Sequence, residues 1–151
     1  MNYFLTPSNN LQKLIEDWQN YERLIIGIDY DSTLYPYREY EGEHCDEVCQ
    51  LVRDLKEIGC FNILWTANKY PEKCAEWCEA KGITIDAVNE NAPEALDYFM
   101  REGYAEPPRK LFFNCLLDNI AGLSETFNHL RTLVYLVKNG IIKKSEILVE
   151  D

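Results

Sequence analysis

Two aspartates separated by one residue are the pair in this sequence best suited to chemistry. Asp29 and Asp31 directly follow the apolar run 24–28, which is too short for a helix and shows no polar alternation. We predict that this run is a buried strand. Two carboxylates at the end of such a strand repel each other and lose solvation unless a cation lies between them. A hard divalent cation with oxygen ligands, such as Mg²⁺, is therefore expected there.

Polar residues also lie next to the other predicted strands. The runs 61–65 and 111–117 have the same apolar character as the first. Each polar neighbour has an ordinary explanation when it is taken singly, as a strand-end hydroxyl, a solvated lysine or a turn cap. Taken together, at one edge of a sheet, they favour a common site. These residues are Thr66, Asn68, Lys110, Asp118 and Asn119.

Apolar runs alternate with amphipathic patterns along the chain. Strands are predicted at 24–28, 61–65, 83–88 and 111–117. Helices are predicted after an N-cap at Ser8 or Asn9, at 45–58, from Pro71 to Gly82, at 93–101, and from an N-cap at Ser124 to Gly140. Strict alternation predicts an α/β fold, a three-layer sandwich with a central, mainly parallel sheet. The tail 141–151 is left open as a further strand or a short helix.

Length and charge restrict the class of protein. The 151 residues, 46% hydrophobic and 27% charged, suit one globular domain. We expect a single domain over 1–151, with a helical arm at 1–22, a core at 24–123 and a C-terminal helix and tail at 124–151. The net charge of −11 argues against polymeric nucleic acid as a partner, because that binding depends on clustered Lys and Arg. A small phosphorylated substrate is still allowed, because a local pocket can outweigh the mean charge.

The sequence shows no sign of membrane insertion or export. No apolar run approaches the roughly 18 residues of a membrane-spanning helix, and residues 1–10 lack the pattern of a signal peptide. A cytoplasmic location with reduced thiols is expected. The cysteines spaced by four residues are Cys45/Cys49 and Cys74/Cys78. This spacing allows a zinc or redox role, but both pairs continue apolar stripes, so we favour buried side chains.

The order and context of the polar residues resemble the four motifs of the haloacid dehalogenase superfamily. Asp29, Asp31 and Thr33 match the Asp-x-Asp-x-Thr motif after the first strand, and Thr66 matches the hydroxyl after the second. Lys110 and Asp118 match the lysine and the acidic motif. The resemblance covers residues 24–123, and the stretch 89–94 is similar to a small cap-less branch found in bacteria and phages.

The resemblance implies a Mg²⁺-dependent phosphatase with a Rossmann-like core. It gives Asp29 the role of the nucleophile that forms an aspartyl-phosphate, and Asp31 the role of general acid and base. It gives Lys110 the role of a fixed positive charge at the nucleophile and the phosphate. The residues expected at the substrate are Ser32, Thr33, Thr66, Asn68 and Lys110. The residues expected at the metal are Asp29, Asp31, with its backbone carbonyl, Asp118 and Asn119.

Three departures from the family pattern affect the site. Ser32 stands where many members have glycine, which is expected to stiffen or reshape the loop while both carboxylates stay in place. Asn119 stands where many have a second aspartate, so the metal site carries one formal charge less and we predict weaker Mg²⁺ binding. The segments 34–44 and 89–108 are too short to carry a cap domain. An open active site is therefore expected.

Several alternatives remain open on the sequence. The Tyr-rich loop 34–40 is either a flap that stacks on a substrate or a surface-packed loop. The substrate could be a nucleotide or a sugar phosphate, and a phosphotransferase is compatible with the same residues. A rival is a fold that binds its ligand without useful turnover. Another is an interaction protein or homo-oligomer, whose interface would cover Tyr35 and Trp18.

Overall fold

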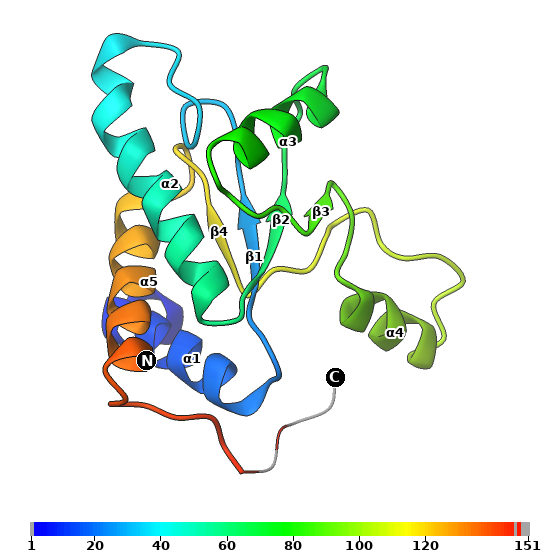
Figure 1. Cartoon of the computed structure of the whole chain (residues 1–151). Coiled ribbons are helices and arrows are strands. Elements are labelled where there is room, and N and C mark those ends of the chain that lie inside the picture. Colours follow the sequence, from blue (N-terminus) through cyan, green and yellow to red (C-terminus); the bar gives the residue numbers. More distant parts are fainter. Residues whose placement is uncertain (1, 147, 149–151) are drawn as a thin grey trace.

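A four-stranded, all-parallel sheet forms the centre of the molecule (Figure 1). The computed structural model describes residues 2–146 and 148. The strands lie in the order β3-β2-β1-β4. Their bounds are Ile25–Ile28 for β1, Phe61–Leu64 for β2, Ala87–Val88 for β3 and Cys115–Leu117 for β4. The predicted α/β class is confirmed, and the carboxyl ends of all strands reach one edge of the sheet, near the top of the view.

The helices occupy the connections that the sequence predicts. They are α1 Pro7–Asn20, α2 Gly42–Glu57, α3 Pro71–Ala80, α4 Pro93–Arg101 and α5 Leu123–Lys138, with short 3₁₀ turns η1 Tyr3–Leu5 and η2 Glu39–Glu41. The segments 34–44 and 89–108 hold loops, η2, the start of α2 and α4, and the described residues form no cap domain. No helix in this part of the chain is both long and apolar enough to cross a bilayer.

The strand side chains alternate between two cores on opposite faces of the sheet. Ile26 and Ile28 belong to the larger core, which α1, α2, α3 and α5 also line. Ile25 and Ile63 belong to a smaller core with Ala92, just before α4, and Phe113, just before β4. This period of two is the strand geometry expected for a sheet covered on both faces. More helices therefore cover the face of the sheet with the larger core than cover the opposite face (Figure 1).

The four cysteines on α2 and α3 lie in the larger core. Cys45, Cys49, Cys74 and Cys78 are all buried free thiols, as favoured from their apolar stripes. Burial in an apolar environment raises the pKa of Cys45 and of Cys78 to about 12. These thiols are protonated at neutral pH and pack as small hydrophobic side chains.

The strand predicted at 111–117 is shorter, and at its start a side chain takes one of the two hydrogen bonds to Ile25. The Asn114 N–H donates to the Ile25 carbonyl at 2.8 Å, and the Asn114 side-chain oxygen accepts the Ile25 N–H at 2.7 Å. The regular ladder then begins with Cys115 opposite Ile26. Phe113, just before Asn114, packs against the smaller core.

The strand predicted at 83–88 is also shorter than expected, and here too a side chain takes a backbone hydrogen bond. The Asp86 carboxylate accepts the Asn62 N–H at 2.8 Å, and the Asn62 amide donates to the Thr84 carbonyl at 3.1 Å. The Asp86 side chain therefore satisfies the Asn62 N–H, while the Asp86 backbone N–H donates to the Asn62 carbonyl at 2.8 Å. The regular β2–β3 ladder is confined to the pairs Ile63–Ala87 and Leu64–Val88. The periodicity of the sequence does not show where a side chain replaces a backbone hydrogen-bond partner.

Both predicted serine caps are wrong. Helix α1 begins at Pro7 after Thr6, so Ser8 and the alternative cap Asn9 both lie inside it. Helix α5 begins at Leu123 after Gly122, whose left-handed backbone (φ 66°) makes the turn, so Ser124 lies inside the helix. Proline at the first helical position and glycine at a left-handed turn provide the helix starts instead. In the tail, residues 141–146 form neither a strand nor a helix, and 147 and 149–151 lie outside the described residues.

Gly27 is required where the smaller core meets β1. A Cβ atom at Gly27 would lie 2.7 Å from the Phe113 ring. Gly27→Ala is therefore expected to lower the free energy of unfolding by about 1–3 kcal/mol, the usual cost of overpacking a core. Urea denaturation monitored by circular dichroism measures this change. The matched control is Gly42→Ala at the start of α2, where a Cβ meets no atom within 4 Å; equal effects of the two substitutions would contradict the prediction.

Candidate active site

Asp29 lies where β1 and β4 end side by side. Its backbone N–H donates to the Leu117 carbonyl at 2.9 Å, which fixes the residue between the two strands. Its carboxylate oxygen Oδ2 accepts the Thr33 hydroxyl at 3.0 Å. The same Thr33 oxygen accepts the Asn119 N–H at 2.9 Å. The buried Thr33 hydroxyl thus links the ends of both strands and orients the first carboxylate.

The surroundings of Asp29 disfavour its charged form. Partial burial is the largest cause, and the neighbouring carboxylates of Asp118 and Asp31 add to it, while the Thr33 hydroxyl opposes them. Together they raise the pKa of Asp29 from 3.8 to about 6. A raised carboxyl pKa next to further carboxylates is typical of functional sites. It is also the electrostatic situation that a bound cation relieves.

Asp31 is held by two donors that come from different segments. The Tyr37 hydroxyl donates to Oδ1 of Asp31 at 2.6 Å. The side-chain N–H of Asn68 donates to the same oxygen at 3.2 Å. The hydrogen bond to the Asp31 carboxylate is the main cause that raises the pKa of Tyr37 to about 12, so the phenol stays protonated and donates. Asp29 and Asp31 therefore have different partners although one residue separates them.

Ser32 adopts the backbone conformation for which glycine is best suited. Its φ is 62°, in the left-handed region, which costs a residue with a Cβ about 1 kcal/mol. Its N–H donates to the Tyr35 carbonyl at 2.9 Å, and its carbonyl oxygen lies 2.8 Å from Nε2 of His44. The turn that separates the two carboxylates is thus kept despite the missing glycine.

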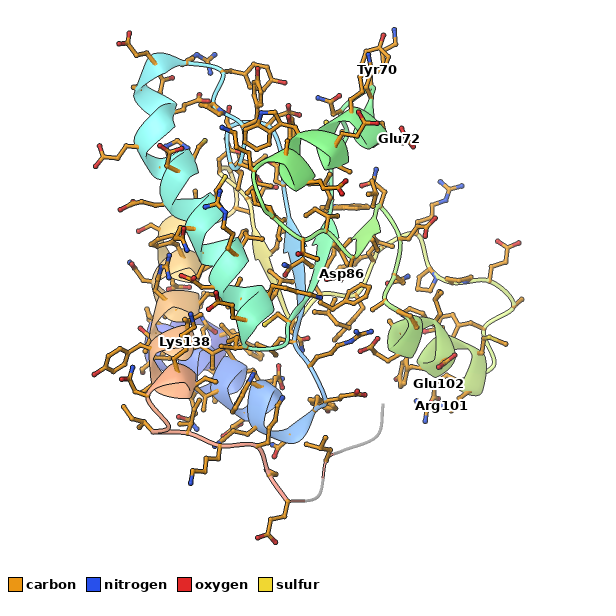
Figure 2. All side chains as sticks on the ribbon, in the orientation of Figure 1. Tyr70, Glu72, Asp86, Arg101, Glu102 and Lys138 are labelled. Atoms are coloured by element: carbon orange, nitrogen blue, oxygen red, sulfur yellow. The ribbon has the colours of Figure 1, made fainter. Side chains whose placement is uncertain are left out.

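The loop after β2 brings Thr66 and Asn68 to the same edge. Asn89 clamps Thr66 by accepting its N–H at 2.8 Å and donating to its carbonyl at 3.0 Å. The Thr66 side-chain oxygen accepts the Asn68 N–H at 3.0 Å. The Asn68 amide accepts the Tyr70 N–H at 2.9 Å while it donates to Asp31. Asn68 thereby couples the second carboxylate to the start of α3, where Figure 2 shows Tyr70 and Glu72.

Asp118 and Asn119 complete this edge after β4. Oδ1 of Asp118 accepts the Ile120 N–H at 3.0 Å. In the orientation that satisfies its neighbours, the Asn119 side-chain nitrogen lies 3.1 Å from Oδ2 of Asp29 and 3.3 Å from Oδ1 of Asp118. The amide N–H groups then point at both carboxylates. In this orientation Asn119 stabilises the two carboxylates by donating hydrogen bonds to them, whereas metal binding would require its oxygen to face the site.

The residues at this edge could supply some, but not all, of the ligands of a magnesium ion. In the part of the chain that the structure describes, no three His, Cys, Asp or Glu side chains are grouped to hold a metal. The Asp31 carboxylate accepts hydrogen bonds from Tyr37 and Asn68. Mg²⁺ usually takes only one or two carboxylates and fills its other positions with water and substrate oxygens. Asp29 and Asp118 supply such a pair. The Asp31 backbone carbonyl accepts no hydrogen bond from the described residues and is available beside them.

Lys110 is the predicted site residue that the described contacts do not join to the others. It is exposed and precedes the amino end of β4, whereas Asp118 follows the carboxyl end. No hydrogen bond or ion pair between described residues connects Lys110 to Asp29 or Asp31. The lysine that follows Asn68 directly is Lys69, whose Nζ lies 5.7 Å from the centre of the Tyr70 ring.

The contact between Tyr37 and Asp31 was not predicted from the sequence. From its composition, the Tyr-rich loop 34–40 was expected to be either a flap or a surface-packed loop. The Tyr35 ring packs against Tyr30 and Trp77, with centroids 5.4 and 5.3 Å apart, so this part of the loop belongs to the surface of the core. Tyr40 is 76% exposed. The sequence feature that could have predicted this contact is a tyrosine six residues after Asp31. It stands in a loop that a preceding aromatic residue, Tyr35, anchors to the core.

Two cavities lie away from these carboxylates. One, of about 400 Å³, lies between α1, α4 and the segment before β4 and is lined by Asp17, Arg23 and Phe112 among others. The other, of about 500 Å³, lies beside α3 and is lined by Glu79, Thr84 and other residues of α3 and the following segment. Cavity size alone would favour these places. The convergence of carboxylates, amides and hydroxyls favours the carboxyl edge of the sheet instead.

Comparison with known proteins supports the fold. No protein-family model and no curated protein matches the chain. A solved structure, described as that of a conserved protein coded by a locus from Bacteroides thetaiotaomicron, matches with a TM-score of 0.53 and 21% sequence identity. The match covers 79% of this chain and 93% of that chain. At this identity the likeness shows the α/β fold alone.

Proposed function

We propose that this protein is a Mg²⁺-dependent phosphomonoester hydrolase of the haloacid dehalogenase type. The observation that carries the proposal is the pair Asp29 and Asp31 at the carboxyl edge of the sheet. One carboxylate accepts the Thr33 hydroxyl and has a raised pKa, and the other is fixed by Tyr37 and Asn68. Two carboxyl groups with different partners are what a nucleophile and an acid/base partner require.

In the proposed first step, a carboxylate oxygen of Asp29 attacks the phosphorus atom. A bond forms between this oxygen and phosphorus, and the ester P–O bond breaks with its electron pair moving to the leaving oxygen. Asp31 gives that oxygen its proton, so an alcohol leaves. Mg²⁺ bound near Asp29 and Asp118 would neutralise the phosphate charge and favour the ionised nucleophile.

In the proposed second step, water attacks the phosphorus of the aspartyl-phosphate. The ionised Asp31 takes a proton from this water, and the bond between phosphorus and Asp29 breaks with its electron pair returning to the carboxylate. Phosphate is released and both aspartates regain their starting states. The Thr66 hydroxyl, held at the same edge by Asn89, is assigned to the phosphoryl oxygens. The role of Lys110 stays a prediction of the resemblance.

The proposed substrate is a small phosphate monoester such as a nucleotide or a sugar phosphate. The described residues form no cap over the edge, so the leaving group can extend into solvent. A hydroxyl of a second molecule could replace water in the second step, which would make the protein a phosphotransferase. Product analysis of the phosphorylated species separates these outcomes.

A second candidate is a protein that keeps the fold but binds its ligand without turnover. The observation that favours it is Asn119, whose amide N–H groups face Asp29 and Asp118 where a second metal-binding carboxylate is expected. The amide would stabilise the site without metal and so reduce the need for Mg²⁺. The two candidates differ in whether Mg²⁺ produces hydrolysis.

The deciding experiment is hydrolysis of 4-nitrophenyl phosphate with Mg²⁺ and with EDTA. We expect Mg²⁺-dependent release of 4-nitrophenol by the native protein and its loss in Asp29→Asn. Asp46→Asn makes the same change at an exposed position on α2 and should leave the rate unaltered. Equal and negligible rates for the native protein and Asp29→Asn, across a panel of phosphorylated metabolites, would reject the hydrolase and favour the binding protein.

A further inference from the structure

The Tyr37 hydroxyl contacts Asp31, the residue to which the proposed function assigns proton transfer. It donates to Oδ1 of Asp31 at 2.6 Å, and the Asn68 amide donates to the same oxygen at 3.2 Å. No described residue donates a hydrogen bond to the other oxygen, Oδ2. With both donors on Oδ1, a proton on Asp31 resides on Oδ2. The carboxyl group is therefore presented in one orientation, with one oxygen bound and the other available.

The loop that carries Tyr37 is fixed independently of Asp31. The Tyr37 N–H donates to Oε1 of Glu41 at 3.0 Å, and Arg38 donates to Oε2 of the same carboxylate at 3.2 Å. Glu41 is only 4% exposed. The Tyr37 ring lies 5.0 Å from the Tyr35 ring, which packs on the core. These contacts hold the segment around Tyr37 in place, so that its hydroxyl reaches Asp31.

The side chain of Tyr37 is exposed enough that its hydroxyl can be removed without a core defect. Its exposed fraction is 57%, and the ring would keep its contact with Tyr35 after the oxygen is lost. The Asp31 carboxyl group would then lose the shorter of its two hydrogen bonds and rotate more freely. Preorganisation of a catalytic group is what such a bond contributes.

We propose that Tyr37 is a positioning residue that holds the Asp31 carboxyl group so that Oδ2 delivers the proton to the leaving oxygen. The role rests on the proposed hydrolase function. In the step concerned, the bond from Asp29 to phosphorus forms and the ester P–O bond breaks. Its electron pair goes to the leaving oxygen, which takes the proton from Oδ2 of Asp31. Tyr37 keeps its own proton throughout and only donates a hydrogen bond to Oδ1.

The test compares two leaving groups with different needs for a proton. Phenol leaves poorly without protonation, whereas 4-nitrophenol leaves well as an anion, so a defect in the acid affects phenyl phosphate selectively. In Tyr37→Phe we expect kcat/KM for phenyl phosphate to fall about tenfold, a part of the 10²–10⁴ that general acid–base catalysis supplies. For 4-nitrophenyl phosphate we expect a fall of less than about twofold, since little proton transfer is needed there. The comparison uses kcat/KM because this ratio depends on the steps up to the formation of the aspartyl-phosphate, before Asp31 acts as a base on water.

Two further variants make the result specific. Tyr40→Phe removes a hydroxyl from the same loop at a side chain that is 76% exposed, and it should change neither substrate. Asn68→Ala removes the second donor to Oδ1. Because Asn68 is also expected at the substrate, this variant should lower kcat/KM for both substrates, with the larger loss on phenyl phosphate. Thermal melts of all variants confirm that they fold.

The outcomes separate this role from the proposed function. Equal losses on both substrates, or no loss on either, would overturn the role of Tyr37 while leaving the hydrolase intact. Absence of Asp29-dependent hydrolysis in the native protein would overturn the hydrolase and, with it, the role of Tyr37. A selective loss in Tyr37→Phe, with Tyr40→Phe unaffected, supports it.

Discussion

Replacing Asp29 with asparagine is expected to reduce Mg²⁺-dependent phosphate release by at least about 10³-fold, because removal of a covalent nucleophile abolishes the main reaction path. The same substitution is expected to stabilise the metal-free protein. The native carboxylate is partly buried beside Asp118 and Asp31, and the neutral amide removes the cost of that charge. The gain at neutral pH should be about 1–2 kcal/mol, after allowance for solvent screening at a partly exposed site.

The pH dependence of this stabilisation follows from the raised pKa of Asp29. Its value is about 6 in the folded protein against 3.8 ordinarily, so the folded state binds the proton more tightly than the unfolded state. The native protein therefore loses stability, relative to Asp29→Asn, as the pH rises from about 4 to about 6. Above this window the difference is constant. Below it the two proteins should have the same stability.

Urea denaturation in EDTA at several pH values measures the difference. Asp46→Asn on α2 is the control, and its difference from the native protein should show no such window. Addition of Mg²⁺ should stabilise the native protein and not Asp29→Asn, because ligand binding to the folded state adds to its free energy of unfolding. A less stable Asp29→Asn in EDTA at neutral pH would show that the carboxylate is not under electrostatic strain.

Changing Asn119 to aspartate is expected to have the second largest effect, on metal affinity. The Asn119 side chain lies 3.1 Å from Asp29 and 3.3 Å from Asp118, so the new carboxylate would face both. We expect Mg²⁺ to bind about ten- to a hundredfold more tightly, the range over which changes around a metal usually act. Without metal, the added repulsion should lower the melting temperature and raise the pKa of Asp29 further.

Isothermal titration with Mg²⁺ and thermal melts in EDTA check the two parts of this prediction. Asn128→Asp makes the same change at an exposed position on α5 and should alter neither quantity. An unchanged Mg²⁺ affinity in Asn119→Asp would place the cation away from β4. A higher melting temperature in EDTA would contradict the proximity of the carboxylates.

Local sequence patterns were sufficient to predict the elements and the edge at which polar residues gather. The apolar run before Asp29 has no polar alternation because both faces of β1 are buried. The strand-helix alternation requires parallel connections, so the carboxyl ends, and the residues Asp29, Thr66 and Asp118, meet at one edge. These are short-range properties, and each can be read from neighbouring residues.

Contacts between distant segments could not be read in this way. The Asn114 side chain takes one backbone hydrogen bond at the start of β4, where the predicted strand is shortened. Lys110 lies before this point and has no described contact to the carboxylates. Tyr37 reaches Asp31 only because Glu41 and Tyr35 hold its loop. Side-chain hydrogen bonds of this kind depend on where the chain returns in space, and a one-dimensional pattern has no periodicity that encodes them. Residue types and order thus specify the chemistry that is available, whereas packing specifies which groups point at one another.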